Sequence, residues 1–175
     1  TGGAKVWRKE GLDNMIQKAT FVKASETGGK AEVELWNAKG VKLGMATFVY
    51  TLQSNGALKV KTTFLPDTSA VTSLARVGLA FEMPYAYNKV SYLGRDQSGC
   101  IGIYHTDAER MFHYYVKPQA TGNRTDVRWM ELADEAGEGL SFRSDKVFQF
   151  SVIPFTDSNV DKATHINKLE RTGII

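Results

Sequence analysis

Apolar and polar residues alternate along much of this chain, which is the spacing that a half-buried β-strand requires. Across residues 45–52, Phe48 and Tyr50 share one face and threonines share the other. The pair Asn55-Gly56 follows, and this dipeptide tolerates the two positive φ angles of a tight hairpin turn. Alternation with lysine and threonine then resumes over 58–64. We therefore predict a β-hairpin over this stretch.

Similar alternation predicts further strands, separated by Gly, Asp and Ser turns, at residues 31–35, 77–81, 126–132 and 147–153. Helical signal is sparse. Thr106-Asp107-Ala108-Glu109 fits a capping box, and Asp157-Ser158 is expected to cap a short helix from Asn159 to His165. With no repeat or linker, the sequence predicts one all-β domain over residues 1–175, an antiparallel sandwich.

The length of 175 residues is enough for a single domain to bury a core without metal or disulfide support. The net charge of +3 is spread along the chain, which disfavours nucleic acid and anionic membranes as partners, and the one cysteine, Cys100, has no internal disulfide partner. No apolar run approaches the ~18 residues of a membrane helix. Because the chain opens Thr1-Gly2-Gly3 with no initiator Met, we expect it to be part of a longer protein.

The usual signatures of chemistry are weak in this chain. His105, His113 and His165 are too widely spaced for a zinc motif, so no metal and no cofactor is expected. Gly137-Glu138-Gly139 is interpreted as a turn and not as a nucleotide-binding loop. Ser141 and Ser151 lie in strand patterns, and neither they nor Cys100 shows the surroundings of an activated nucleophile.

Paired carboxylates are the remaining route to hydrolysis, because a glycosidase needs two of them roughly 5–9.5 Å apart. The candidates are assigned to turns, a strand end or a helix start, where carboxylates have capping or solvated roles; they are Glu131, Asp134, Glu135, Glu138, Asp157 and Asp161. We therefore predict no catalytic, substrate-binding or metal-binding residue in this chain.

The segment from Tyr114 to Trp129 is not explained by turns, helix caps or solvated side chains alone. Arg124, Asp126 and Arg128 fall on one face at period two, and Val127 and Trp129 fall on the other. A carboxylate between two guanidiniums can hold both, so we predict a salt-bridge ladder on one face and a buried Trp129 on the other, with Arg128 bonded to a carboxylate or to backbone carbonyls.

The run Pro118-Gln119-x-x-Gly122-Asn123-Arg124-Thr125-Asp126-Val127-Arg128-Trp129 resembles the signature of the C-terminal, small-chain domain of bacterial β-galactosidases of glycoside hydrolase family 2. Further matching motifs run through most of the chain: Trp7 with Gly11-Leu12-Asp13, Tyr50, Pro66-Asp67, Leu74-Ala75-Arg76-Val77-Gly78-Leu79, Tyr92-Leu93-Gly94-Arg95, Gly102-Ile103-Tyr104, and Phe148-Gln149-Phe150-Ser151 leading to Pro154-Phe155-Thr156. Each motif is weak alone, and together they are specific.

This resemblance implies an antiparallel β supersandwich related to the galactose-mutarotase-like fold. It also implies that both catalytic glutamates lie in an upstream barrel domain of the same chain, to which this domain adds a wall of the galactose pocket and a closure over the barrel mouth. The whole enzyme would be a retaining β-galactosidase, active on terminal β-galactosides and assembled as a homo-oligomer, in the cytoplasm or periplasm of a bacterium.

The resemblance breaks at several places. Relatives usually continue Gly-Pro-x-Glu-Asn-Tyr after the Tyr-x-Gly-Arg motif, whereas Asp96 follows Arg95 at once in this sequence. Either the loop has been deleted, or a loop is missing from the given sequence between Arg95 and Asp96. We predict the second, so that Arg95 and Asp96 are not covalent neighbours. Ala120 replaces a common Glu, and the sugar-stacking Trp of the family is expected beyond Ile175. Two alternatives remain open: a free-standing carbohydrate-binding sandwich, which needs an exposed aromatic platform from Trp7, Trp36 or Trp129, and an aldose mutarotase, which needs a His and a carboxylate in one cleft.

Overall fold

The computed structural model describes residues 2–74, 76–112 and 122–173. The chain divides into two compact units, Thr1–Gly78 and Leu79–Ile175. Each unit is built on its own four-stranded antiparallel sheet, so the all-β class expected from the alternation is confirmed. That residues 1–175 act as one domain stays a prediction. No helix in the described ranges is long and apolar enough to span a membrane.

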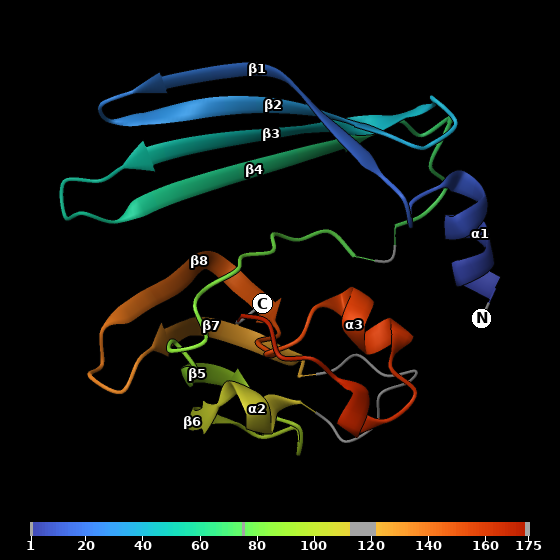
Figure 1. Ribbon diagram of the computed structural model, residues 1–175. Helices are drawn as coiled ribbons and strands as arrows, with labels where there is room; N and C mark the ends of the chain where they lie inside the picture. Colours follow the sequence, from blue (N-terminus) through green and yellow to red (C-terminus); the bar gives the residue numbers. More distant parts are fainter. Residues whose placement is uncertain (1, 75, 113–121, 174–175) are drawn as a thin grey trace. The chain divides into compact units, whose positions relative to one another are not determined.

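The first unit is a meander of four strands in the order β1-β2-β3-β4, preceded by a helix (Figure 1). Its elements are α1 (Gly2–Glu10), β1 (Ile16–Ser25), β2 (Gly28–Trp36), β3 (Lys42–Leu52) and β4 (Leu58–Pro66). The predicted hairpin is β3–β4, with Leu52 opposite Leu58. Its turn differs in detail from the expectation, because Gly56 has a positive φ of 83° whereas Asn55 instead uses its side chain to accept from the Ala57 N–H.

Helix α1 and strand β1 were not predicted from the sequence. Asn37, a buried polar residue, fixes the end of α1: its Nδ2 donates to the Glu10 carbonyl at 3.0 Å, and its Oδ1 accepts from the N–H groups of Lys39 and Val41. Strand β1 is an edge strand with every residue exposed. It has no buried face, so its alternation is blurred and gives little signal.

The second unit is a sheet of order β6-β5-β7-β8 with short helices after β6 and β8 (Figure 1). Its elements are β5 (Lys89–Arg95), β6 (Ile101–Asp107), α2 (Ala108–Met111), β7 (Arg124–Ala133), β8 (Gly139–Phe150), α3 (Asp157–Lys162) and the 3-10 turn η1 (Ile166–Lys168). One face of this sheet forms a core together with α2 and the segment after β8; its buried residues are Val90, Tyr92, Ala108, Met111, Val127, Met130, Leu132 and Val152.

Several local predictions need correction. Residues 77–81 form no strand, although their apolar residues alternate, because no neighbouring strand pairs with them. The capping box at Thr106 is absent: Asp107 is the N-cap of α2 and makes no side-chain cap. In α3 the cap is Thr156, whose Oγ1 accepts from the Asn159 N–H at 3.1 Å, so the helix starts earlier than expected. The strand predicted at 147–153 ends at Phe150.

The prediction that Arg95 and Asp96 are not covalent neighbours stays a prediction, and the structure describes the two residues at the end of a strand and the start of a turn. Strand β5 runs through Arg95, which pairs with Ile101, and the Asp96 N–H donates to the Cys100 carbonyl at 3.1 Å. A tight turn with Gly99 at φ 86° therefore closes the β5–β6 hairpin.

Candidate functional site

Strand β7 holds the three charged residues of the signature, Arg124, Asp126 and Arg128, in three different environments. Arg124 is buried, with 6% of its surface exposed, and its Nε donates to the Tyr92 hydroxyl at 2.9 Å. Asp126 accepts from Arg95 Nε at 2.8 Å, and Arg128 donates to the Asp126 carbonyl at 2.7 Å. The predicted salt-bridge ladder is therefore wrong, whereas the predicted backbone bond of Arg128 is confirmed.

The backbone of β7 explains why simple alternation fails here. Asp126 adopts a positive φ of 51°, and the pairing with β8 shifts register on both sides of Val127. These bulges turn Arg124 and Val127 into the core and bring Met130 and Leu132 onto the same face. Trp129 is left half-buried on the opposite side, so its predicted burial is wrong.

An aromatic cluster surrounds the buried guanidinium. The Arg124 guanidinium carbon lies 5.9 Å from the centre of the Tyr92 ring, which stacks on Tyr104 at 5.3 Å and meets Phe150 edge-on at 5.4 Å. The Tyr92 hydroxyl and the Asn123 carbonyl, 3.1 Å from Nη1, supply the acceptors. The charge is thus stabilised by hydrogen bonds and ring faces, and among the described residues no carboxylate forms an ion pair with it.

The β5–β6 turn beside this cluster is held by one carboxylate. Asp96 Oδ1 accepts from the hydroxyl and N–H of Ser98 and from the N–H of Cys100. The hydrogen bond from the Ser98 side chain is the main cause that lowers the pKa of Asp96 below its ordinary value. Desolvation raises the pKa of Tyr104, whose hydroxyl donates to the Cys100 carbonyl. Asp96 is therefore a structural anion that stabilises a turn.

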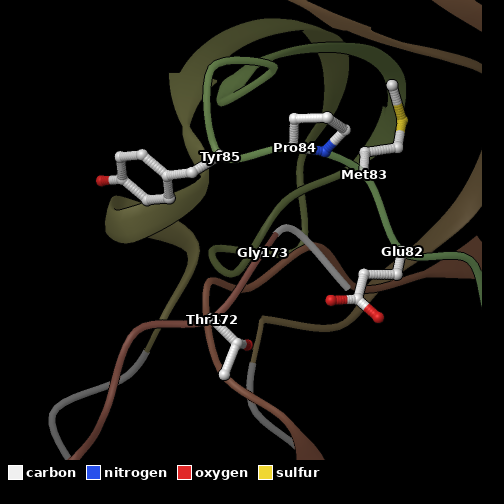
Figure 2. Close-up of a pocket in the computed structure, with 6 residues that line it drawn as sticks. All are labelled: Glu82, Met83, Pro84, Tyr85, Thr172 and Gly173. Atoms are coloured by element: carbon white, nitrogen blue, oxygen red, sulfur yellow. The ribbon is translucent and has the colours of Figure 1, made fainter.

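A hollow of about 530 Å³ lies elsewhere in the second unit, where residues 82–85 approach the C-terminal segment (Figure 2). Its lining residues are Glu82, Met83, Pro84, Tyr85, Thr172 and Gly173. The close approach requires Gly173, because a Cβ there would lie 2.6 Å from the Met83 carbonyl oxygen. Figure 2 shows the Tyr85 ring pointing away from the other lining side chains.

The Tyr85 hydroxyl donates to the Glu109 carboxylate, which also pairs with Arg171 at 2.8 Å. That hydrogen bond is the main cause that raises the pKa of Tyr85. Since Glu109 already accepts from both groups, it serves as an anchor for the C-terminal segment and offers no free base to a substrate.

The two described histidines, His105 and His165, each lie beside a hydroxyl group. His105 Nδ1 lies 2.8 Å from Ser91 Oγ, His165 bonds Thr164, and His113 lies outside the described residues. Across residues 2–74, 76–112 and 122–173, no three His, Cys, Asp or Glu side chains gather in a way that could hold a metal ion.

The candidate carboxylates occupy turn and ion-pair positions. Asp134 Oδ1 accepts from the N–H groups of Ala136 and Glu138, which closes the β7–β8 turn at Gly137 as expected. Glu135 pairs with Lys89 at 2.8 Å. Glu131 lies within β7, and the side chains of Asp157 and Asp161 are not among those described.

Comparison with known protein families gives a match over nearly the whole chain. A family model described as beta galactosidase small chain matches residues 2–175. The chain belongs to this family. Among its relatives, a beta-galactosidase of Priestia megaterium is 24% identical over 94% of this chain, which covers 16% of the relative. A beta-galactosidase of Lactobacillus delbrueckii subsp. bulgaricus is 31% identical over 72% of this chain, which covers 13% of that protein. The small-chain sequence therefore spans less than a fifth of the relatives it matches.

Several features of this small chain were missed from the sequence. The motif at 92–95 was noted, but its partnership with β7 through the Arg124–Tyr92 and Arg95–Asp126 bonds was not. Alternation alone could not supply these partners, because Tyr92 and Arg95 lie on opposite faces of β5, whereas a period of two puts Arg124 and Asp126 on one face of β7. The link between Tyr85, Glu109 and Arg171 had no sequence signal, because its members lie far apart in the chain.

Proposed function

We propose that this chain is a non-catalytic C-terminal part of a longer bacterial β-galactosidase, which hydrolyses terminal β-galactosides. The observation that carries the proposal is the match of residues 2–175 to the small-chain family, combined with relatives named beta-galactosidase of which the chain covers only 13–18%. In such an enzyme, a retaining mechanism needs two carboxylates about 5–5.5 Å apart. The proposal assigns them to an upstream barrel.

The role proposed for this chain is to complete one wall of the galactose pocket and to close the barrel mouth. The environments of the described carboxylates favour a structural role over a catalytic one. Glu109, Asp96 and Asp134 each hold a turn or a chain segment, and none has the unengaged, desolvated environment of a general acid. No specific observation favours either alternative, the free-standing carbohydrate-binding sandwich or the aldose mutarotase. All three tryptophans are half-buried, with Trp7 bonded to Ser73 and Trp36 bonded to Glu34.

The experiment assays the purified 175-residue chain on a chromogenic β-galactoside and, in parallel, tests it for anomerisation of galactose. We expect no turnover in either assay. Genomic sequence upstream of Thr1 is expected to encode a barrel with two glutamates, and the fused protein is expected to be active. Hydrolysis by the 175-residue chain that a substitution of Glu82 or Glu131 abolishes would contradict the proposal.

A further inference from the structure

The hollow between residues 82–85 and the C-terminal segment contains a charged side chain without a partner (Figure 2). Among the described residues, Glu82 makes no hydrogen bond or ion pair. Its carboxylate lies against the C-terminal segment, because a Cβ on Gly173 would lie 3.3 Å from Glu82 Oε1. Thr172 uses its N–H on the Pro154 carbonyl at 3.1 Å, while its hydroxyl has no partner in the same described part of the chain. Free acceptor oxygens therefore line one wall of the hollow.

The other charges beside this hollow already have partners. Glu109 accepts from the Tyr85 hydroxyl and pairs with Arg171 at 2.8 Å. The guanidinium carbon of Arg171 also lies 5.9 Å from the centre of the Tyr85 ring. The two carboxylates, Glu82 and Glu109, and the one guanidinium leave a single negative charge without a counterion. A group that enters the hollow is therefore favoured if it carries one positive charge.

The shape and the apolar lining of the hollow favour one kind of cation. Met83 and Pro84 provide apolar surface beside the carboxylate, and the volume of about 530 Å³ is large enough for a long side chain. Arginine combines an apolar stem with a planar guanidinium that can form two parallel hydrogen bonds to one carboxylate. The ammonium of lysine is a more strongly hydrated point charge without this fork. Arginine is therefore the side chain that matches both walls.

The exposure of Glu82 indicates where such an arginine comes from. An ion pair with an exposed carboxylate is weak, so a free ligand at low concentration would leave the hollow empty. A tethered group instead has an effective concentration in the millimolar range, which compensates for weak binding. The chain covers only 13–18% of its relatives, so more than four-fifths of each relative lies outside it.

We propose that the hollow receives an arginine side chain from another part of the longer enzyme, with its guanidinium on Glu82 and its stem on Met83 and Pro84. The inference rests on the proposed function only for the source of the arginine, because a free arginine derivative tests the hollow itself. Failure of that binding would leave the proposed function standing. An upstream sequence without a barrel would remove the source of the arginine and not the binding.

The first experiment titrates N-acetyl-arginine amide into the ¹⁵N-labelled 175-residue chain and follows amide shifts. We expect saturable shifts confined to residues 82–85 and 171–173, with a dissociation constant on the order of 10 mM. N-acetyl-citrulline amide has a side chain of the same length without the charge, and it is the control ligand. It is expected to bind about threefold more weakly, as the loss of an exposed ion pair implies.

Two matched variants locate the contact. In Glu82→Gln we expect the arginine derivative to bind no better than the citrulline derivative, because the charge that distinguishes them is gone. The melting temperature should not change, since Glu82 has no partner to lose among the described residues. Glu138→Gln removes a carboxylate from the β7–β8 turn of the same unit, and it is expected to keep the preference for arginine.

A second experiment tests the source of the arginine in the longer enzyme. Thr172→Cys places a thiol in the lining, and its rate of modification is measured on the peptide that contains position 172. We expect the thiol to react more slowly in the longer enzyme than in the 175-residue chain. Adding Glu82→Gln should speed the reaction about threefold more in the longer enzyme than in the 175-residue chain, because it releases the arginine. An equal effect in both proteins would overturn the assignment to an arginine of the longer enzyme.

Three results would overturn the binding of arginine. They are no saturable shift with the arginine derivative, equal binding of the citrulline derivative to the wild-type chain, and an unchanged preference for arginine in Glu82→Gln. Binding of N-acetyl-lysine amide as tight as that of the arginine derivative would overturn the assignment to a guanidinium. If Glu82→Gln fails to fold, the wild-type chain still decides the question, because the preference for arginine should disappear in about 0.5 M sodium chloride.

Discussion

Arg124 shows how a single charged residue can be buried in a core that is otherwise apolar. Its guanidinium donates hydrogen bonds to the Tyr92 hydroxyl and the Asn123 carbonyl, and the face of the Tyr92 ring lies beside it. Removing an acceptor from such a group leaves a buried donor unsatisfied, which costs more than the net worth of the bond. The Tyr92 hydroxyl is thus more important than its small size suggests.

We expect Tyr92→Phe to lower the free energy of unfolding by about 1–3 kcal/mol, because the Arg124 Nε–H would lose its acceptor while the ring packing is kept. Urea or thermal unfolding measures the change. Tyr50→Phe is the matched control, since the exposed Tyr50 makes no hydrogen bond within the described residues. Equal effects of the two substitutions would contradict the buried role of the Tyr92 hydroxyl.

Asp126 combines an ion pair with a backbone conformation that favours few residues. Its pair with Arg95 is about two-fifths exposed on both sides, so we expect Asp126→Asn to cost no more than about 1 kcal/mol. Asn tolerates positive φ, whereas a β-branched residue does not. Asp126→Val should therefore cost about 1–3 kcal/mol more than Asp126→Asn in the same unfolding measurement. A smaller loss for Val than for Asn would show that the φ of 51° does not matter.

At the scale of elements, the turns between strands depend on glycines with particular backbone conformations. Gly56 in the β3–β4 turn has a φ of 83° and open space around its Cα, so conformation alone demands glycine there. Gly78 also has open space, but its φ is not in the left-handed region. Because a Cβ would meet no neighbour at either glycine, alanine substitutions at the two positions isolate the effect of the backbone φ.

We expect Gly56→Ala to destabilise the chain by about 1 kcal/mol, because alanine is strained at positive φ. Gly78→Ala should be neutral or stabilising by up to about 1 kcal/mol, since it only restricts the unfolded chain. Thermal melting of the two variants tests the difference. Destabilisation by Gly78→Ala as large as that by Gly56→Ala would contradict this explanation.

The β2–β3 pairing is also expected to depend on pH. The hydrogen bond from Lys42 at 2.6 Å, with a second one from the Trp36 indole, lowers the pKa of Glu34. A carboxylate with a lowered pKa stabilises the fold above its ordinary pKa, near about 4.3, and this contribution is lost as the pH falls through the lowered value. Melting temperatures from neutral to acid pH should therefore fall less steeply for Glu34→Gln. Parallel curves for variant and wild type would contradict this.

Alternation predicted those strands that bury one face or form a hairpin, namely β2, β3, β4 and β7. It failed for β1, which buries neither face, and for 77–81, where the pattern has no partner strand. The positions of Trp129 and Arg124 could not be predicted, because bulges around Val127 reset the faces of β7. Family motifs indicated which residues matter, but the partners of Arg124 and Asp126 depend on β5, which alternation did not identify.

At the scale of the whole chain, burial is uneven between the two units. The first unit buries Leu43, Ala46 and Val71, whereas the second buries the larger cluster around Tyr92 and Met111. Apolar burial is the main stabilising term of a fold. The second unit is therefore expected to be the more stable of the two.

Amide hydrogen exchange on the 175-residue chain tests this expectation. We expect the central strands β5 and β7 to be the most protected and β1 to exchange at least about tenfold faster, because exchange in β1 needs only local opening. Protection in β1 equal to that of β7 would show that the two units unfold in one step.

The exposure of β1 also bears on how this chain behaves at high concentration. An edge strand presents unpaired backbone N–H and C=O groups, which a second chain can extend into a continuous sheet. Phe21 and Val22 would favour such growth, and they stand between Lys18 and Lys23 and beside a bulge at Ala19–Phe21. Positive charge and a local twist are the two features that discourage strand addition. The lysines of β1 therefore act as gatekeepers against fibrous aggregation, so replacing them with neutral residues is expected to shorten the time before the protein aggregates.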